Sequence, residues 1–199
     1  MVEMSRRYNG LDFNRKPQTK ISGEHIRELI SWLFWIVISA IIAFVIMYVF
    51  GFRTNVIGNS MEPGLYSGQQ ILIDRLTYNV SMPKRGDVVA FVPNGNEDTH
   101  ISVKRIIGLP GEKVLIKDGY VYIDGVLLDE AGAYDKIADP GILEQELELD
   151  EDQFIVLGDN RNFSEDSRSG NIGVIESGYL VGRVWFKLSG NLEQLGFVR

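Results

Sequence analysis

The stretch that organises this chain is Val56-Ile57-Gly58-Asn59-Ser60-Met61-Glu62-Pro63-Gly64-Leu65. It runs apolar into a glycine, presents one hydroxyl and closes with Pro-Gly, so the backbone must turn sharply with Ser60 near the apex. A hydroxyl at such an apex is well placed to be a nucleophile. Serine at neutral pH is a weak nucleophile, however, and needs a base that accepts its proton.

The candidate base is Lys104, in the apolar run Ile101-Ser102-Val103-Lys104-Arg105-Ile106-Ile107. If this run is a strand, alternation puts Lys104 on the same face as Ser102 and Ile106. On an inward face, burial disfavours the ammonium, lowers the pKa of the lysine and frees an amine to act as base. Considered alone, the run is better explained by a lysine that protects a sheet edge from aggregation.

A third polar motif reads Gly158-Asp159-Asn160-Arg161-Asn162-Phe163-Ser164-Glu165-Asp166-Ser167-Arg168-Ser169. It follows a run typical of a buried strand and concentrates hydroxyls, carboxylates and two arginines in a short stretch. One interpretation is a polar loop rich in Asx turns and held by ion pairs. The functional alternative is a set of supporting groups that orients a catalytic side chain.

The composition excludes several kinds of site. Having no cysteine removes disulfides, thiolate nucleophiles and Cys-ligated zinc. The two histidines are too few for a His-based metal site, and a Ser-His-Asp triad could use only His100 because His25 precedes the apolar segment. Residues 51–199 carry 14 basic and 23 acidic groups, which argues against nucleic acid as a partner. We therefore predict no metal, no cofactor and no nucleic acid.

The segment 29–50 contains no charged residue and is rich in Ile, Val, Leu, Phe and Trp. At about 1.5 Å per residue it covers the roughly 30 Å hydrocarbon core, which predicts a transmembrane helix. A buried core helix would show a polar face. A cleavable signal peptide would have a shorter, earlier apolar segment and an Ala-x-Ala-like exit. The basic tail 1–28 indicates a single-pass protein of the cell membrane with a cytoplasmic N-terminus and residues 51–199 outside.

Beyond the helix, seven short apolar runs separated by turn signals are typical of strands. They cover residues 70–76, 87–92, 101–107, 113–116, 120–123, 154–157 and 180–186. Lys117-Asp118-Gly119 predicts a hairpin between two of them. Since no amphipathic helices intervene, the pattern predicts a mainly β, antiparallel, barrel-like domain. Residues 129–152 are dense in Asp and Glu, and we expect a solvated loop there.

Taken together and in this order, the membrane segment and the three motifs resemble bacterial type I signal peptidases. The resemblance covers almost the whole chain and implies the signal-peptidase fold with one N-terminal transmembrane helix. It also implies a serine endopeptidase that removes N-terminal signal peptides from secreted preproteins at small-x-small sites through an acyl-enzyme. Secretory preproteins and membrane lipid would be the partners. Archaeal and eukaryotic relatives use His where this chain has Lys104, so His100 is interpreted as a bystander.

The resemblance assigns roles position by position. Ser60 matches the acylating nucleophile, and Lys104 matches the general base that accepts its proton and later activates the deacylating water. Ser164 matches the hydroxyl that hydrogen-bonds and orients the lysine amine. Supporting ion pairs are expected between Asp166 and Arg168 and between Asp159 and Arg105. The substrate pockets would be lined by Val56, Ile57, Gly58, Met61, Leu65 and Val103.

Two positions depart from the family pattern. Gly64 stands where many members carry Thr. Gly58 stands where some carry a Ser whose hydroxyl helps the oxyanion hole, so the Ser60 N–H is the main identifiable donor. Gly58 and the short body both resemble the Gram-positive branch.

Two rival interpretations stay open. A repressor-type Ser/Lys self-cleaving protease would need a DNA-binding domain and a cleavable internal segment. A non-enzymatic, membrane-anchored β domain would display a binding face instead of cleaving. A sortase is excluded because the chain has no cysteine.

Overall fold

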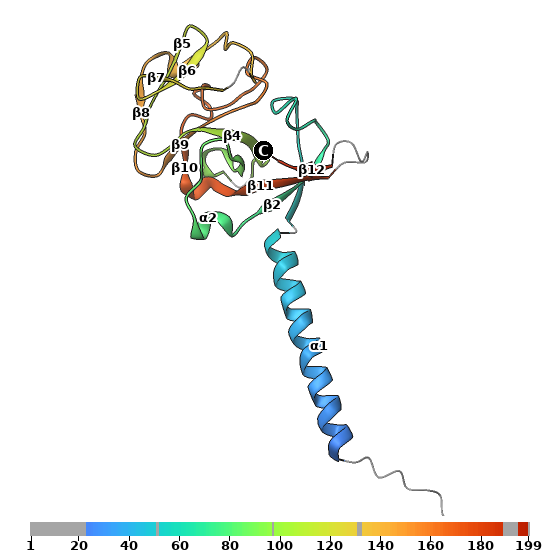
Figure 1. The fold of residues 1–199 in the computed structure, drawn as a ribbon. Helices are drawn as coiled ribbons and strands as arrows, with labels where there is room; N and C mark the ends of the chain where they lie inside the picture. The colour runs from blue at the N-terminus through green and yellow to red at the C-terminus, as the bar shows by residue number, and fades with distance from the viewer. Residues whose placement is uncertain (1–22, 51, 97, 131–132, 189–194, 199) are drawn as a thin grey trace, which may run out of the picture. The chain divides into compact units, whose positions relative to one another are not determined.

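The computed structural model describes residues 23–50, 52–96, 98–130, 133–188 and 195–198. The chain forms two compact units, Met1–Ala43 and Phe44–Arg199 (Figure 1). The predicted tail 1–28 lies mostly outside the described residues, which begin at Gly23.

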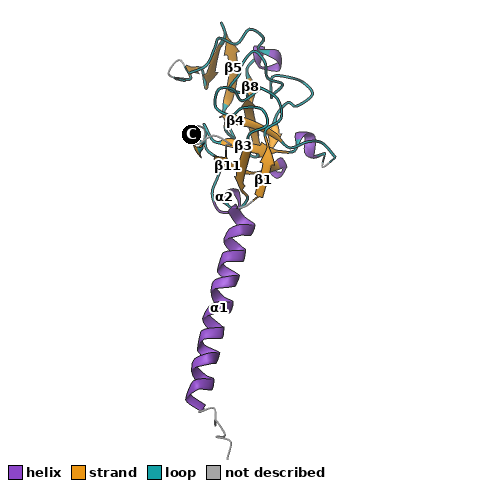
Figure 2. Ribbon diagram, turned by 90° about the vertical axis from the view of Figure 1, so that its right-hand side faces the viewer, coloured by secondary structure: helices purple, strands orange, loops and turns teal. Residues whose placement is uncertain are grey.

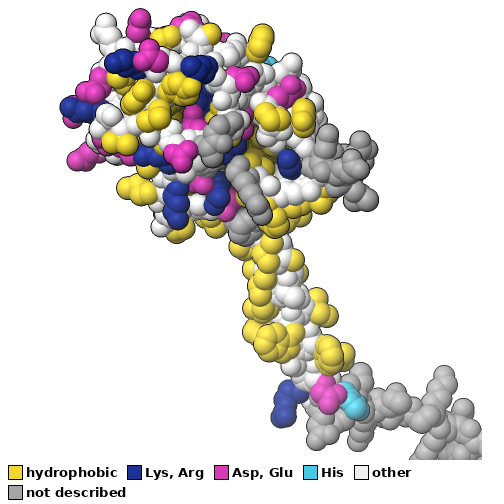
Figure 3. All heavy atoms as spheres, turned by 45° about the horizontal axis from the view of Figure 1, so that its top comes forward, with side chains coloured by type: hydrophobic (Ala, Val, Ile, Leu, Met, Phe, Trp, Pro, Cys, Tyr) yellow, Lys and Arg dark blue, Asp and Glu magenta, His cyan; other side chains and the backbone are white. Residues whose placement is uncertain are grey.

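Helix α1 runs from Gly23 to Phe50. Its part His25–Tyr48 has a mean hydropathy of 2.7 and is long and apolar enough to cross a membrane. The apolar side chains along it are exposed (Figure 3). The helix begins before residue 29, the start we predicted, because hydropathy marks the lipid-compatible part of a helix and not its first hydrogen-bonded turn. Polar residues such as His25 and Glu28, which approach to 3.7 Å, continue the same helix.

The larger sheet of the second unit has eight antiparallel strands (Figure 2). They are β1 (Phe52–Asn55), β2 (Gln70–Asp74), β3 (Val88–Phe91), β4 (Ser102–Gly108), β9 (Gln153–Leu157), β10 (Ile175–Glu176), β11 (Leu180–Leu188) and β12 (Gly196–Phe197). The order is β1-β2-β11-β3-β4-β9-β10, with β12 paired to β11. The sheet is curled into a half-barrel. Strand β4, which carries Lys104, therefore lies inside the sheet between β3 and β9.

A smaller sheet has the order β7-β6-β5-β8. Its strands are β5 (Lys113–Lys117), β6 (Tyr120–Ile123), β7 (Val126–Leu127) and β8 (Leu147–Glu148). Asp118 and Gly119 both have positive φ, as a tight hairpin between β5 and β6 requires. Ile107 and Leu157 of the larger sheet share one buried cluster with Val114 and Val121 of the smaller one. A common apolar core thus joins the two sheets.

Short helical turns connect the strands. They are α2 (Thr77–Val80), η1 (Pro93–Gly95), η2 (Gly141–Glu144) and η3 (Ser177–Tyr179). All seven predicted strands are present, and the predicted hairpin and the antiparallel, mainly β class are confirmed. The short strands β1, β7, β8, β10 and β12 were not predicted, because two to four residues are too few to show alternation.

The prediction of a solvated loop at residues 129–152 is wrong in part. Ile137, Leu143 and Leu149 are buried in the core that joins the two sheets. Strand β8, inside this segment, pairs with β5. The acidic side chains alternate with apolar ones here, so carboxylates such as Glu146 and Glu148 point outward while the backbone packs on the domain.

Candidate active site

The Ser60 turn is held by backbone hydrogen bonds that close its loop and by two buried side chains. Backbone bonds between Val56 and Gln69 and between Gly68 and Val56, of 2.9 and 2.8 Å, close the loop that follows β1. Inside it, the Leu65 N–H donates to the Met61 carbonyl at 2.8 Å. Met61 and Leu65 are fully buried in an apolar cluster. The two side chains anchor the turn in the core, so Ser60 is held at a defined position.

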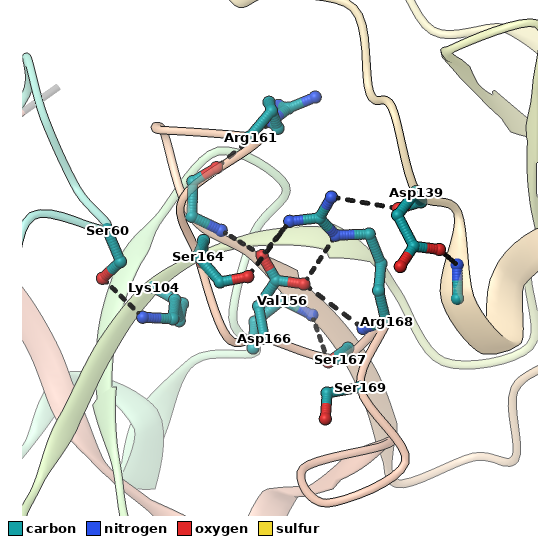
Figure 4. Close-up of polar contacts among 12 residues, drawn as sticks. Ser60, Lys104, Asp139, Val156, Arg161, Ser164, Asp166, Ser167, Arg168 and Ser169 are labelled. Atoms are coloured by element: carbon teal, nitrogen blue, oxygen red, sulfur yellow. Dashed lines mark hydrogen bonds and ion pairs between the residues drawn. The ribbon is translucent and has the colours of Figure 1, made fainter.

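Lys104 reaches Ser60 from strand β4. Its Nζ donates a hydrogen bond of 2.6 Å to Ser60 Oγ (Figure 4). Lys104 is only 6% exposed, and its backbone pairs with that of Val89 in the neighbouring strand β3. Burial lowers the pKa of Lys104 below its ordinary 10.5, although Asp166 and Glu165 act in the opposite direction. Among the described residues, Ser60 Oγ is the only hydrogen-bond partner of Lys104 Nζ, which favours a neutral amine.

The predicted pair of Asp166 and Arg168 forms behind this dyad. Asp166 is fully buried, and Arg168 donates to its two oxygens through Nε and Nη2, each at 2.8 Å (Figure 4). The Gly158 N–H donates to Asp166 Oδ2 at 3.0 Å. Burial alone would raise the pKa of Asp166, but the bonds from Arg168 and Gly158 outweigh it and lower that pKa. Asp166 is therefore ionised and fixes the loop that contains it.

Ser164 lies in this loop, but its position differs from the expectation. In the described part of the chain its enclosed Oγ makes no hydrogen bond of good geometry, and none to Lys104. Figure 4 shows the hydroxyl directed to the Asp166 carboxylate, whose pKa it helps to lower. The side-chain torsion of a serine is set by its three-dimensional surroundings, so the sequence could not show this direction.

The second predicted pair, Arg105 with Asp159, also forms. Arg105 donates through Nε and Nη2 to the two Asp159 oxygens at 2.8 and 2.7 Å. The pair lies against the Ser60 turn, because a Cβ added at Gly64 would come within 2.5 Å of Asp159 Oδ2. Glycine at position 64 thus accommodates this carboxylate, and a Thr would require the pair to move.

Two residues of the third motif hold the nucleophile itself. The Asn160 N–H donates to the Ser60 carbonyl at 3.0 Å, and Asn160 Nδ2 donates to the Asn59 carbonyl at 3.2 Å. A Cβ added at Gly158 would come within 2.5 Å of the Ser60 carbonyl oxygen and would overlap the Ser164 side chain. Our prediction did not include Asn160 or Gly158 as site residues. Their place in the motif was visible, but backbone contacts have no signal in a sequence.

A cavity of about 130 Å³ opens beside the dyad. It is lined by Val56, Ile57, Ser60, His100, Ile101, Ser102, Val103 and Lys104. Of the predicted pocket residues, Val56, Ile57 and Val103 are in this wall. Met61 and Leu65 are buried core instead, while Gly58 lies outside the lining with a φ of 79°. His100, interpreted from the sequence as a bystander, lines the cavity.

The backbone along this cavity has an open edge. Strand β4 pairs with β3 from Ser102 to Arg105, whereas it pairs with β9 only from Arg105 onward. In the described part of the chain, residues 102–104 therefore have a partner strand on one side only. An extended peptide could add to the free side, next to Ser60.

Comparison with known proteins identifies the family of this chain. The family model described as "Signal peptidase, peptidase S26" matches residues 29–189. The chain belongs to the signal peptidase family, peptidase S26. Membership in this family assigns it signal peptidase activity.

Individual members of the family show how far the similarity extends. A signal peptidase IB from Staphylococcus aureus is 31% identical over 180 residues, covering 81% of this chain and 90% of the relative. A probable signal peptidase I-2 from Synechocystis is 35% identical over 144 residues, covering 67% of this chain and 64% of the relative. A signal peptidase I structure from Enterococcus faecalis is 28% identical, with a TM-score of 0.39, and covers 53% of this chain and 98% of its own.

Proposed function

We propose that this chain is a membrane-anchored serine endopeptidase that removes signal peptides from secreted preproteins, with Ser60 as nucleophile and Lys104 as general base. The single observation that carries the proposal is the 2.6 Å hydrogen bond between the buried Lys104 amine and Ser60 Oγ. Nucleophile and base lie within the distance that proton transfer requires.

Acylation begins with a neutral Lys104. The amine accepts the proton of the Ser60 hydroxyl while Oγ attacks the scissile carbonyl carbon, and the carbonyl π electrons move to oxygen. The Ser60 N–H donates to no acceptor in the described part of the chain, so it is free to stabilise this oxyanion. The Lys104 ammonium then gives its proton to the departing amine, the C–N bond breaks, and the signal peptide remains as an ester on Ser60.

Deacylation uses the same two groups. Lys104, neutral again, accepts a proton from a water molecule that attacks the ester carbonyl. The tetrahedral intermediate collapses with cleavage of the bond to Ser60 Oγ, which takes back the proton from Lys104. The products are the signal peptide, whose new carboxyl group releases its proton to water, and the regenerated dyad.

The cavity and the open edge support a preference for small side chains. A precursor segment bound along residues 102–104 would direct alternate side chains into the cavity, which has only about 130 Å³. Val56, Ile57 and Val103 give it an apolar wall. Alanine-sized residues at alternate positions fit this volume, in line with small-x-small cleavage sites.

Helix α1 supports the anchoring part of the proposal. An apolar stretch with a mean hydropathy of 2.7, His25–Tyr48, ends twelve positions before Ser60. The basic residues before it favour a cytoplasmic N-terminus and an extracytoplasmic catalytic domain. Anchoring near the membrane would raise the effective concentration of preproteins, which carry their own apolar helix.

The test is cleavage of a preprotein with an Ala-x-Ala site by the detergent-solubilised full chain. We expect a product cut after the second alanine from wild-type protein and none from Ser60→Ala. Ser67→Ala, an exposed serine of the same loop, is the matched control and should cleave at the wild-type rate. Binding of the preprotein without product from wild type would instead favour the non-enzymatic binding domain.

A further inference from the structure

We infer that Glu130 is a positioning residue for the reaction of Ser60 and Lys104. It lies in the acidic segment that we had expected to be a solvated loop, and it acts through Arg161 on the loop 158–168 behind the dyad. The inference rests on the proposed function, since it concerns the rate of that reaction.

Arg161 is the buried partner of Glu130. It is 3% exposed, and its Nη1 donates to Glu130 Oε2 at 2.7 Å while Nη2 donates to Oε1. The guanidinium also lies over the Tyr134 ring, with 4.1 Å from Cζ to the centroid. One carboxylate and one aromatic face, both from the acidic segment, thus surround a charge that is nearly excluded from water.

The remaining nitrogen of Arg161 connects this cluster to the active-site loop. Arg161 Nε donates to the Gly158 carbonyl at 3.2 Å. On its other side, the Gly158 N–H is bound by Asp166. Gly158 also has no free space toward the Ser60 carbonyl and the Ser164 side chain. A shift of Arg161 would therefore move Gly158, and through Gly158 the Ser60 backbone that it contacts.

The acidic segment contacts the same loop at further points through its backbone. Asn162 accepts a bond from the Ala138 N–H at 2.9 Å and donates to the Lys136 carbonyl at 3.0 Å. Arg168 Nη1 donates to the Asp139 carbonyl at 3.2 Å. Figure 4 shows Asp139 and Arg168 facing each other in this region. These bonds keep the segment docked in a variant that changes only the Glu130 side chain.

Removing the charge of Glu130 would leave the Arg161 guanidinium buried without its carboxylate. Such a group moves toward water or toward another acceptor, because an unpaired buried charge is strongly unfavourable. Apart from Ser60, the residues that line the substrate cavity are 56–57 and 100–104, which belong to other elements than the loop 158–168. The expected effect is therefore a lower kcat with little change in KM.

The experiment compares Glu130→Gln, Glu130→Asp and Glu151→Gln with wild type, as full chains in detergent, with a preprotein that carries an Ala-x-Ala site. For Glu130→Gln we expect kcat to fall roughly ten- to a hundredfold, as for a small misplacement of reacting groups, with KM within about twofold. Glu130→Asp keeps the carboxylate and should recover part of the rate. Glu151→Gln, an exposed acid of the same segment, should match wild type.

Thermal unfolding of each variant separates positioning from simple loss of fold. All rates are compared at a temperature where every variant is fully folded. A wild-type kcat in Glu130→Gln would overturn the inference, and so would a rate loss that only follows the loss of folded protein. If wild type itself fails to cleave, the proposed function is wrong; if wild type and Glu130→Gln cleave equally well, only the role of Glu130 is wrong.

Discussion

Lys104 and the Asp166–Arg168 pair are neighbours in the site, and both are buried. The surroundings of Asp166 stabilise its charged form, whereas those of Lys104 favour its neutral form. The Asp166 carboxylate accepts four hydrogen bonds that stabilise its ionised form, three from Arg168 and one from the Gly158 N–H. Within the described residues, the Lys104 amine makes one hydrogen bond, to the Ser60 hydroxyl. Burial shifts the pKa of any titratable group in the direction that favours its neutral form, and only specific charged or hydrogen-bonding partners reverse that shift. The site thus keeps a rigid charged support beside an amine that can lose its proton.

The largest effect is expected from removing the amine. Lys104→Ala leaves Ser60 without a base, so the cleavage rate should fall by at least about four orders of magnitude while the fold is retained. The measurement is initial rate of preprotein cleavage, with far-UV circular dichroism of both proteins. Lys117→Ala, an exposed lysine at the end of β5, is the matched control. Retention of most activity in Lys104→Ala would remove the dyad from consideration.

A second effect is expected from breaking the charged support. Asp166→Asn leaves Arg168 buried without its carboxylate, which should lower the free energy of unfolding by about 3–5 kcal/mol. The pKa of Asp166 is lowered in the folded state, so its ionised form stabilises the protein at neutral pH. That contribution is lost as the pH falls from the ordinary value of 3.8 toward the folded pKa.

Denaturant unfolding at neutral pH measures this difference. Asp150→Asn, an exposed aspartate, should unfold like wild type. An equally stable Asp166→Asn variant would show that the pair contributes nothing, and the contrast with Lys104 would lose its structural basis.

The smallest effect is expected from Ser164. Its hydroxyl faces Asp166 and not Lys104 and makes no hydrogen bond of good geometry in the described part of the chain, so Ser164→Ala should slow cleavage by no more than about fivefold, or roughly 1 kcal/mol. The rate is compared with that of Ser169→Ala in the same loop. A loss as large as that of Lys104→Ala would mean that Ser164 turns to the amine during the reaction, whereas wild-type turnover would make it structural only.

Much of the site could be predicted because its signals are local. Alternation along residues 101–107 put Lys104 on the same face as Ile106, which is buried, although the run alone favoured an edge lysine; the Gly and Pro residues around Ser60 indicated the turn. Whether Met61 lines a cavity or fills the core, and whether Ser164 faces Lys104 or Asp166, depends on the three-dimensional packing around each side chain. The prediction of a solvated loop at residues 129–152 failed for the same reason. The density of charge in this segment does not reveal that apolar side chains between the acids, such as Leu143, are buried.

The central claim is that Lys104 acts as a neutral amine, and the pH dependence of kcat/KM tests it most directly. Below its pKa the lysine is protonated and cannot accept a proton, so activity should rise with pH through an apparent pKa below 10.5. Glu165 raises the pKa of Lys104, so in Glu165→Gln this acid limb should move to lower pH, while in Glu151→Gln it should not move. An acid limb that stays in place in Glu165→Gln, or that lies at the pKa of an ordinary lysine, would contradict the account.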